Sequence, residues 1–197
     1  MSSEAEAPPR TRDPARKERI LAAAADLVAR HGYHAVSMAD IGAAAGITGA
    51  GIYRHFDSKS AVLVALFDRV IDGLVREEQD IVAGTPDLRE TLDKLIAGQV
   101  EFAVRDRELA RVYHNEIHNL PEQDRRWLRR KQRLYIEEWV HVLVELRPGL
   151  TDTEARTIVH AAIGAIQSTL FNRVGLPEPR LRELLAECAR SVMINGG

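Results

Sequence analysis

The stretch that decides the fold runs from Ser37 to Lys59 and reads SMADIGAAAGITGAGIYRHFDSK. Ser37 begins a Ser-x-x-Asp pattern, which resembles a capping box and predicts a short helix that ends at Gly46. Thr48 is placed to cap a further short helix that continues through Phe56. Because glycine adopts the positive φ of a tight turn, the two short helices are expected to meet at Gly46, which is the pattern of a helix-turn-helix.

Helical patterns continue on both sides of this motif. Apolar residues recur at helical spacing from Pro14 to a cap at Gly32, and Ser58 is placed to cap a helix that runs to about Val82. Five further helical segments are predicted over residues 87–105, 107–119, 122–146, 152–174 and 178–194, and prolines and glycines mark most of the breaks. No segment shows the alternation of a strand, so we expect an all-α fold of about nine helices.

Composition and charge divide the chain. Residues 1–13 are polar and rich in proline, which predicts a disordered arm, while residues 14–58 form the predicted helix-turn-helix domain and residues 59–197 a larger helical domain. The net charge is −2, yet residues 8–60 carry eight Lys/Arg against five Asp/Glu. This local basic excess permits contact with DNA phosphates.

Several function classes find no support in the residues. The apolar runs are shorter than the roughly 20 residues of a membrane span and no secretory signal is evident, so we expect a cytoplasmic chain without membrane contact. Cys188 is the only cysteine and cannot form an intramolecular disulfide. No catalytic or cofactor motif is found, so neither an enzyme nor a cofactor is predicted. His114 and His118 lie four residues apart without an evident third ligand, so no metal site is predicted.

The predicted second helix of the motif presents small and polar residues on its outer side. Tyr53, His55 and Lys59 offer hydrogen-bond donors to phosphate oxygens, and Arg54 is suited to read a guanine. The candidate DNA-contacting residues are Ser37, Thr48, Gly49, Ala50, Tyr53, Arg54, His55 and Lys59. Basic residues before the first helix, Arg10, Arg12 and Arg16, are placed to reach the backbone or the minor groove. The alternative is that Tyr53, His55 and Phe56 are only core residues of a helical bundle.

Three segments together resemble the DNA-binding domain of TetR-family transcriptional regulators. They are Arg19-Ile-Leu-Ala-Ala-Ala through Gly32, Ser37 through Thr48, and Ile52-Tyr-Arg-His-Phe-Asp-Ser-Lys59, and they lie within about residues 15 to 62. The resemblance implies that Tyr53, His55 and Lys59 touch phosphates. Gly42 stands where the family often has alanine, and Thr48-Gly-Ala-Gly51 replaces a Ser/Thr-rich start, which leaves the operator sequence undetermined.

The resemblance also implies a homodimer that binds a double-stranded DNA operator with pseudo-palindromic symmetry and leaves it when a small-molecule effector binds. Two apolar stripes are the candidate dimer interface: Val159, Ile163, Ile166 and Leu170, and then Leu181, Leu184, Leu185 and Cys188. The alternative is that both stripes face the protomer's own core.

The same resemblance implies an effector pocket among the middle helices. Its candidate residues are Phe102, Tyr113, Glu116, Trp127, Tyr135, Trp139, His160 and Gln167, although each aromatic also fits an ordinary core position. The basic run from Arg125 to Arg133 is either a solvated face or a site for a phosphate-bearing effector, for which a fatty acyl-CoA is the leading hypothesis. The alternative function is a helical ligand- or metal-binding protein with a vestigial DNA-binding motif.

Overall fold

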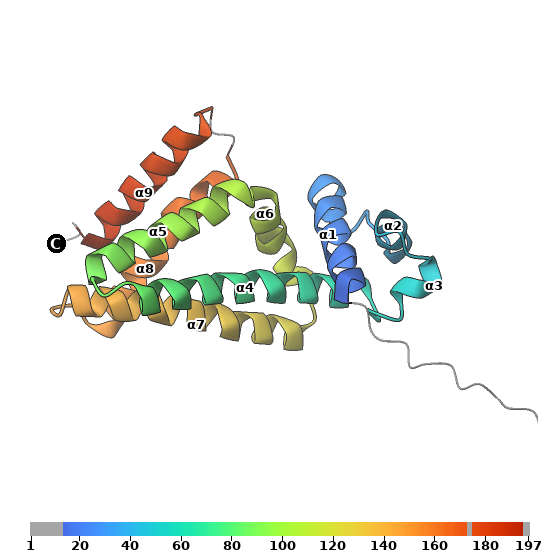
Figure 1. Cartoon of the computed structure of the whole chain (residues 1–197), viewed down its shortest axis with the longest axis horizontal. Helices are drawn as coiled ribbons and strands as arrows, with labels where there is room; N and C mark the ends of the chain where they lie inside the picture. Colours follow the sequence, from blue (N-terminus) through green and yellow to red (C-terminus); the bar gives the residue numbers. More distant parts are fainter. Residues whose placement is uncertain (1–13, 173–174, 195–197) are drawn as a thin grey trace, which may run out of the picture.

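The computed structural model describes residues 14–172 and 175–194, and it shows a small helical unit at one end of a larger helical bundle (Figure 1). The small unit holds α1 (Pro14–His31), α2 (Met38–Ala44) and α3 (Gly49–Ile52). The bundle holds α4 (Lys59–Gly84), α5 (Leu88–Arg105), α6 (Arg107–Glu116), α7 (Glu122–Leu146), α8 (Asp152–Gln167) and α9 (Glu178–Ile194). Short 3-10 turns follow α6 (Ile117–Asn119) and α8 (Ser168–Leu170).

The described residues form nine α-helices and no strand, so the prediction of an all-α fold is confirmed. No helix among these residues is long and apolar enough to cross a membrane. The predicted arm over residues 1–13, with Arg10 and Arg12, lies outside the described residues.

The N-terminal caps of two helices form as their sequences predict. The Ser37 hydroxyl accepts a hydrogen bond from the backbone N–H of Asp40 at 3.2 Å, and the Asp40 carboxylate accepts one from the backbone N–H of Ser37 at 2.8 Å. Aspartate thus completes the capping box in place of glutamate. The Ser58 hydroxyl caps α4 by accepting from the backbone N–H of Ala61 at 3.1 Å.

The helix α3 is shorter than predicted. It ends at Ile52, and the chain continues through a turn to Phe56, whose side chain is buried. Ser58 then adopts the extended conformation of an N-cap, so α4 begins too soon for α3 to continue. Thr48 occupies the N-cap position of α3, but its side chain makes no capping hydrogen bond.

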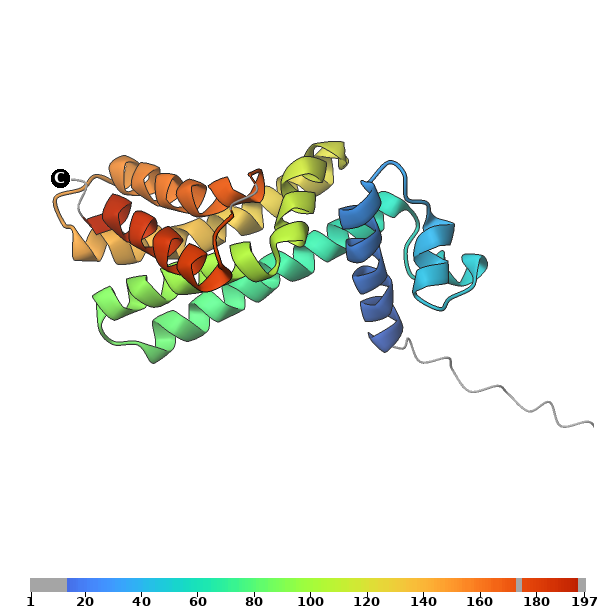
Figure 2. The same cartoon turned by 90° about the horizontal axis from the view of Figure 1, so that it is seen from above.

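Two hydrophobic cores lie along α4, the long helix that runs from the small unit into the bundle (Figure 2). The first part of α4, with Leu66, Phe67 and Ile71, belongs to the core of the small unit, which also receives residues of α6 and α7. Farther along, Leu74 and Ile81 pack against the core formed by α5, α7, α8 and α9. Residues on both sides of the predicted domain boundary at residue 58 therefore pack together in the first core.

Most residues of the two predicted dimer stripes are not exposed to a partner protomer. Five of their eight residues are buried within the protomer: Val159, Ile163, Ile166, Leu170 and Leu185. The alternative, that the stripes face the protomer's own core, holds for these five, because α8 and α9 pack side by side against α5 and α7. Leu181 is half-buried, and only Leu184 and Cys188 are exposed.

Candidate nucleic-acid interface and effector cavity

The outer surface of the helix-turn-helix carries most of the predicted DNA-contacting residues. Ala50, Tyr53 and Arg54 are exposed, and 55% of the Tyr53 side chain is accessible although the residue is aromatic. Ile41, Ile52 and Phe56 are buried on the inner side. The alternative that Tyr53 is a core residue is therefore wrong, whereas it is right for Phe56.

The remaining candidates at this surface have mixed exposure. Thr48 and Ser37 are exposed, and His55 is half-buried. Gly49 begins α3. Arg16 lies in the first turns of α1. Ser37 is engaged in the cap of α2, so any contact it makes with DNA comes in addition to that structural role.

Two glycines shape the turn between α2 and α3. Gly46 has a φ of +68°, the left-handed region that side chains disfavour. A Cβ at Gly51 would lie 2.7 Å from Cγ2 of Ile47 and 3.0 Å from Oγ1 of Thr48. Glycine at residue 51 therefore lets α3 pack tightly against the residues before it. This close packing explains why residue 51 is small although it lies in the helix that is predicted to read bases.

Lys59 has a role inside the protein that the sequence did not reveal. Its ammonium donates hydrogen bonds to the backbone carbonyls of Tyr33 at 2.6 Å and Val36 at 2.7 Å. The same Nζ lies 4.3 Å from the centre of the Tyr33 ring. Lys59 thus ties the start of α4 to the loop between α1 and α2, and two of its three donors are used in doing so.

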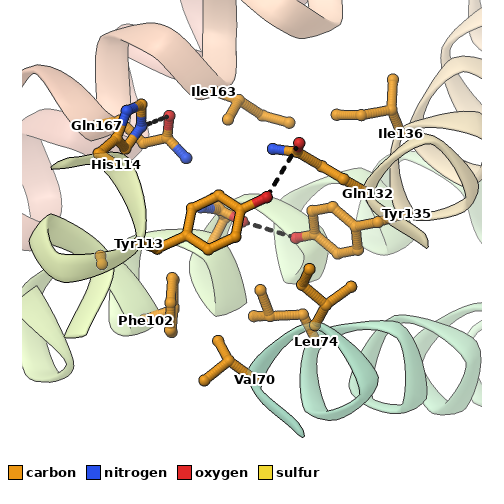
Figure 3. Close-up of a pocket in the computed structure, with 13 residues that line it drawn as sticks. Val70, Leu74, Phe102, Tyr113, His114, Gln132, Tyr135, Ile136, Ile163 and Gln167 are labelled. Atoms are coloured by element: carbon orange, nitrogen blue, oxygen red, sulfur yellow. Dashed lines mark hydrogen bonds between the residues drawn. The ribbon is translucent and has the colours of Figure 1, made fainter. Parts of the chain in front are cut away.

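A largely apolar cavity lies between α4, α5, α6, α7 and α8 (Figure 3). Its lining residues are Val70, Ile71, Leu74, Gln99, Phe102, Ala110, Tyr113, His114, Gln132, Tyr135, Ile136, Ile163 and Gln167. Its volume is about 60 Å³. This is far below the roughly 300 Å³ at which ordinary small-molecule sites begin, so the helices must separate before a larger ligand enters.

Polar contacts tie the helices together around this cavity. The Tyr113 hydroxyl reaches Oε1 of Gln132 at 3.4 Å, and the His114 ring nitrogen lies 3.2 Å from Oε1 of Gln167 (Figure 3). Burial raises the pKa of Tyr113 to about 12, so this phenol keeps its proton, and its ability to donate a hydrogen bond, to a higher pH than an exposed tyrosine does. These contacts join α6 to both α7 and α8.

The structure brings four of the eight predicted pocket residues to this cavity, namely Phe102, Tyr113, Tyr135 and Gln167. The other four lie elsewhere. Trp139 is fully buried in the core, and His160 is exposed on α8. Trp127 is exposed on α7 and donates from its indole to Asp68, while Glu116 accepts from Asn119.

Other lining residues were not among the candidates. Leu74 and Ile163 resemble ordinary core residues in the sequence, and two glutamines, Gln99 and Gln132, also line the cavity. Gln99 carried a usable signal, because it is a polar residue on the apolar face of α5 and is buried there. His114 also lines the cavity, where it meets Gln167. Among the described residues no group of three or more His, Cys, Asp or Glu is arranged to hold a metal ion.

The basic run on α7 is partly neutralised. Arg125 and Arg126 pair with Glu122, and Lys131 pairs with Asp68 and Asp72 on α4 at 2.6 Å. Arg129, Arg130 and Arg133 are exposed. Most of this run is therefore a solvated face with local ion pairs. Three exposed guanidinium groups on α7 remain as candidates for binding phosphate.

Sequence models of regulatory proteins match two parts of the chain. Residues 20–66 match the model described as "Bacterial regulatory proteins, tetR family", and residues 85–170 match "Tetracyclin repressor-like, C-terminal domain". A curated relative, the HTH-type transcriptional repressor KstR2 of Rhodococcus jostii (strain RHA1), is 31% identical over 129 residues, which cover 65% of this chain and 63% of that protein. The match therefore spans less than two thirds of that relative's length.

Solved structures share the fold along most of the chain. A TetR-family regulator from Bordetella parapertussis 12822 gives a TM-score of 0.79 at 24% identity, covering 92% of this chain and 96% of that one. FadR from Bacillus subtilis, in complex with stearoyl-CoA, gives a TM-score of 0.75 at 22% identity, covering 91% of this chain and 99% of that one. At these identities the likeness shows the fold alone.

Proposed function

The chain belongs to the TetR family of bacterial regulatory proteins, and from this premise we propose that it is a homodimeric repressor that a hydrophobic effector releases from a pseudo-palindromic operator. The observation that carries this proposal is the course of α4. This one helix contributes Leu66 and Phe67 to the core of the DNA-binding unit and Val70, Ile71 and Leu74 to the wall of the cavity. The family is one of regulators rather than enzymes, in agreement with the absence of catalytic motifs.

The proposed DNA contacts divide into two kinds. Tyr53 and His55, with Ser37 and Thr48 beside them, donate to phosphates and set the register of α3 in the major groove. Arg54 reads a base edge, while Gly49 and Ala50 allow close approach. Lys59 acts mainly through the position it gives to α4, because two of its donors are already engaged.

Effector binding in the cavity affects the DNA-contacting surface through the position of α4. Because the cavity is small in this conformation, a bound ligand must displace α4 relative to α6, α7 and α8. The displacement is passed to the DNA-binding unit through the shared core on α4, so the effector favours a spacing of the two DNA-reading units that no longer matches the operator.

We infer that the effector is an acyl-CoA thioester or a chemically similar molecule. The apolar lining suits a hydrocarbon part, and the exposed Arg129, Arg130 and Arg133 on α7 suit phosphate groups. The stearoyl-CoA bound to FadR, a protein of the same fold, supports this class of ligand.

The proposed dimer forms through the outer faces of α8 and α9 rather than through the buried stripes. Small residues, Ala161 and Gly164, are exposed on α8, and Leu184 and Cys188 are exposed on α9. Small side chains let helices approach closely, and the apolar Leu184 offers area for burial, so two copies of this pair of helices form a four-helix contact.

In vitro selection from a random double-stranded DNA library tests the DNA-binding part of this proposal. The wild-type protein is expected to enrich two inverted half-sites, and lack of enrichment would contradict the proposal. Arg54→Ala should relax selection at one base pair of each half-site by about 1–3 kcal/mol. Tyr53→Phe should weaken binding to all sequences alike, by about three- to tenfold. Arg30→Ala is the matched control, because Arg30 is exposed on α1 and pairs with Asp26.

The effector part is tested on the selected operator by fluorescence anisotropy. Acyl-CoA thioesters of increasing chain length are added to the complex, with free CoA as the control. Release of DNA by the thioesters but not by CoA supports the proposal. If saturating concentrations of every chain length leave the complex intact, acyl-CoA release is refuted.

A further inference from the structure

Glu78 on α4 is a buried acid without a partner. Only 2% of its surface is exposed, and neither carboxyl oxygen has a hydrogen-bond partner among the described residues. An unpaired polar group in such a position costs stability, so its presence calls for a ligand, a bound water or a functional role.

Glu78 lies directly behind the effector cavity. It lines a small inner cavity of about 10 Å³, together with Leu74, Glu77, Ile81, Leu95, Gly98, Gln99 and Tyr135. Three of these residues, Leu74, Gln99 and Tyr135, also line the effector cavity. They form the partition between the two spaces, and Glu78 lies one helical turn beyond Leu74 on α4.

The partition is partly polar. The Tyr135 hydroxyl donates to Oε1 of Gln99 at 2.8 Å (Figure 3). The Tyr135 ring packs edge-on against Trp139, which is fully buried in the core. A hydrogen-bonded pair of polar side chains therefore separates the largely apolar effector cavity from the carboxyl group of Glu78, which is unpaired among the described residues.

The acid itself is uncharged at neutral pH. Burial, and secondly the nearby Glu138, raise the pKa of Glu78 from its ordinary 4.5 to about 9. Among the described residues, Glu77 lines the same inner cavity and Glu138 acts on the carboxyl group electrostatically, and both are acids. A neutral carboxyl group has one O–H donor and one carbonyl acceptor, which is the complement of a hydroxyl group and also binds a ketone.

We propose that Glu78 becomes the polar end of the effector cavity when a bound effector displaces the partition, and that it selects an effector whose buried end carries an uncharged oxygen function, a hydroxyl or a ketone. The inference rests on the proposed function, since it assigns the effector to this cavity. A plain hydrocarbon end leaves the carboxyl unpaired, and sites built around a buried hydrogen bond reject such analogues strongly. An ammonium end must leave water for a largely apolar space, which opposes its entry.

Isothermal titration calorimetry on the full chain, without DNA, tests this selectivity. The probes are hexanoyl-, octanoyl-, decanoyl- and dodecanoyl-CoA, each compared with its ω-hydroxy and ω-amino counterparts. At the chain length that reaches Glu78, the ω-hydroxy thioester is expected to bind about ten- to a hundredfold more tightly than the plain one. Equal binding of the pair at every length, a preference for the plain chain, or a preference for the amine overturns the inference. Equal binding is also the outcome expected if a water molecule already satisfies Glu78.

Variants of Glu78 test whether this residue causes the preference for the ω-hydroxy thioester. Glu78→Leu should abolish the ω-hydroxy preference and retain binding of the plain thioester, whereas Glu78→Gln, which still donates and accepts, should retain most of the preference. Asp80→Leu is the matched control, because Asp80 is exposed on the same helix two residues away. Preference that survives in Glu78→Leu overturns the assignment. Glu78→Gln keeps the test informative if the leucine variant does not fold.

The two proposals fail in different ways. If the ω-hydroxy thioester binds preferentially but does not release DNA, the proposed mechanism of release is wrong and the assignment of Glu78 stands. If plain and ω-hydroxy thioesters release DNA at the same concentrations and bind equally, the proposed function stands and the assignment of Glu78 is wrong. If no thioester binds at any length, both the acyl-CoA class and the assignment fail.

Discussion

Replacing Glu78 with glutamine should stabilise the protein, and by an amount that depends on pH. The pKa of this carboxyl is about 9 in the folded protein, because it is buried and lies near Glu138, against an ordinary 4.5. Between these two values the folded state holds a proton that the unfolded state has released. Wild-type stability therefore falls as the pH rises from about 4.5 to about 9. Glutamine has nearly the same shape and does not titrate.

The size of this stabilisation follows from the shift in the pKa of Glu78. Each pH unit within the window costs the wild type about 1.4 kcal/mol relative to the variant. At pH 7 the solution is roughly 2.5 pH units above the ordinary pKa at which the unfolded state begins to lose this proton. Glu78→Gln should therefore raise the free energy of unfolding by about 3 kcal/mol. Below about pH 4 the two proteins should be nearly equally stable, because Glu78 is then largely protonated in both states of the wild type.

Urea unfolding followed by circular dichroism measures this difference at several pH values and one protein concentration. Other titrating groups act alike in both proteins, so the difference between them isolates Glu78. Asp80→Asn, at an exposed position on the same helix, serves as the control and should change stability little at any pH. A Glu78→Gln difference that stays constant from pH 5 to pH 8 would refute the reasoning, since it would mean that Glu78 titrates normally in the folded protein.

Three further outcomes follow from the structure. Lys59→Ala should lower the free energy of unfolding by about 1–3 kcal/mol by leaving two carbonyls of the loop between α1 and α2 without their donor, as measured by urea unfolding. Gly46→Ala should cost about 1–2 kcal/mol because of its positive φ, whereas Gly73→Ala, with open space around a helical Cβ, should stabilise by about 0.5–1 kcal/mol in the same assay. Leu184→Glu should convert the proposed dimer to a monomer in analytical ultracentrifugation, while Phe171→Glu, an exposed control in the segment between α8 and α9, should not; a dimer that persists in the first variant would contradict the proposed interface.

The DNA-binding unit was predictable because its signals are local. The Ser37 cap acts over three residues, and the turn at Gly46 depends on its own backbone conformation. The length of α3 was not predictable from these signals alone. It depends on the burial of Phe56 and on the cap of the next helix at Ser58.

The dimer stripes show what periodicity cannot decide. An apolar stripe on a helix says that one face is covered, but not whether the protomer or a partner covers it. On α8 the stripe with Val159 and Ile163 turned out to face inward, and the outer face carries the smaller Ala161 and Gly164. The same limit applies to the residues of the cavity: Tyr135 and Trp139 lie one turn apart on α7, but only Tyr135 reaches the cavity.

The sequence by itself determined the helices, most of their ends and the motif that identifies the family, because these depend on residues within one or two turns of each other. Only the tertiary structure decided which residues have unusual surroundings. Lys59 meets the carbonyls of Tyr33 and Val36, far away in the sequence, and Glu78 loses its solvent because α5 and α7 pack over α4. Glu78 continues the apolar spacing of Ile71, Leu74 and Ile81, whereas its exposed neighbour Glu77 does not. Burial and long-range hydrogen bonds arise from the packing of distant segments, so this spacing indicates the face of α4 on which Glu78 lies but not that the acid is left there without a partner among the described residues.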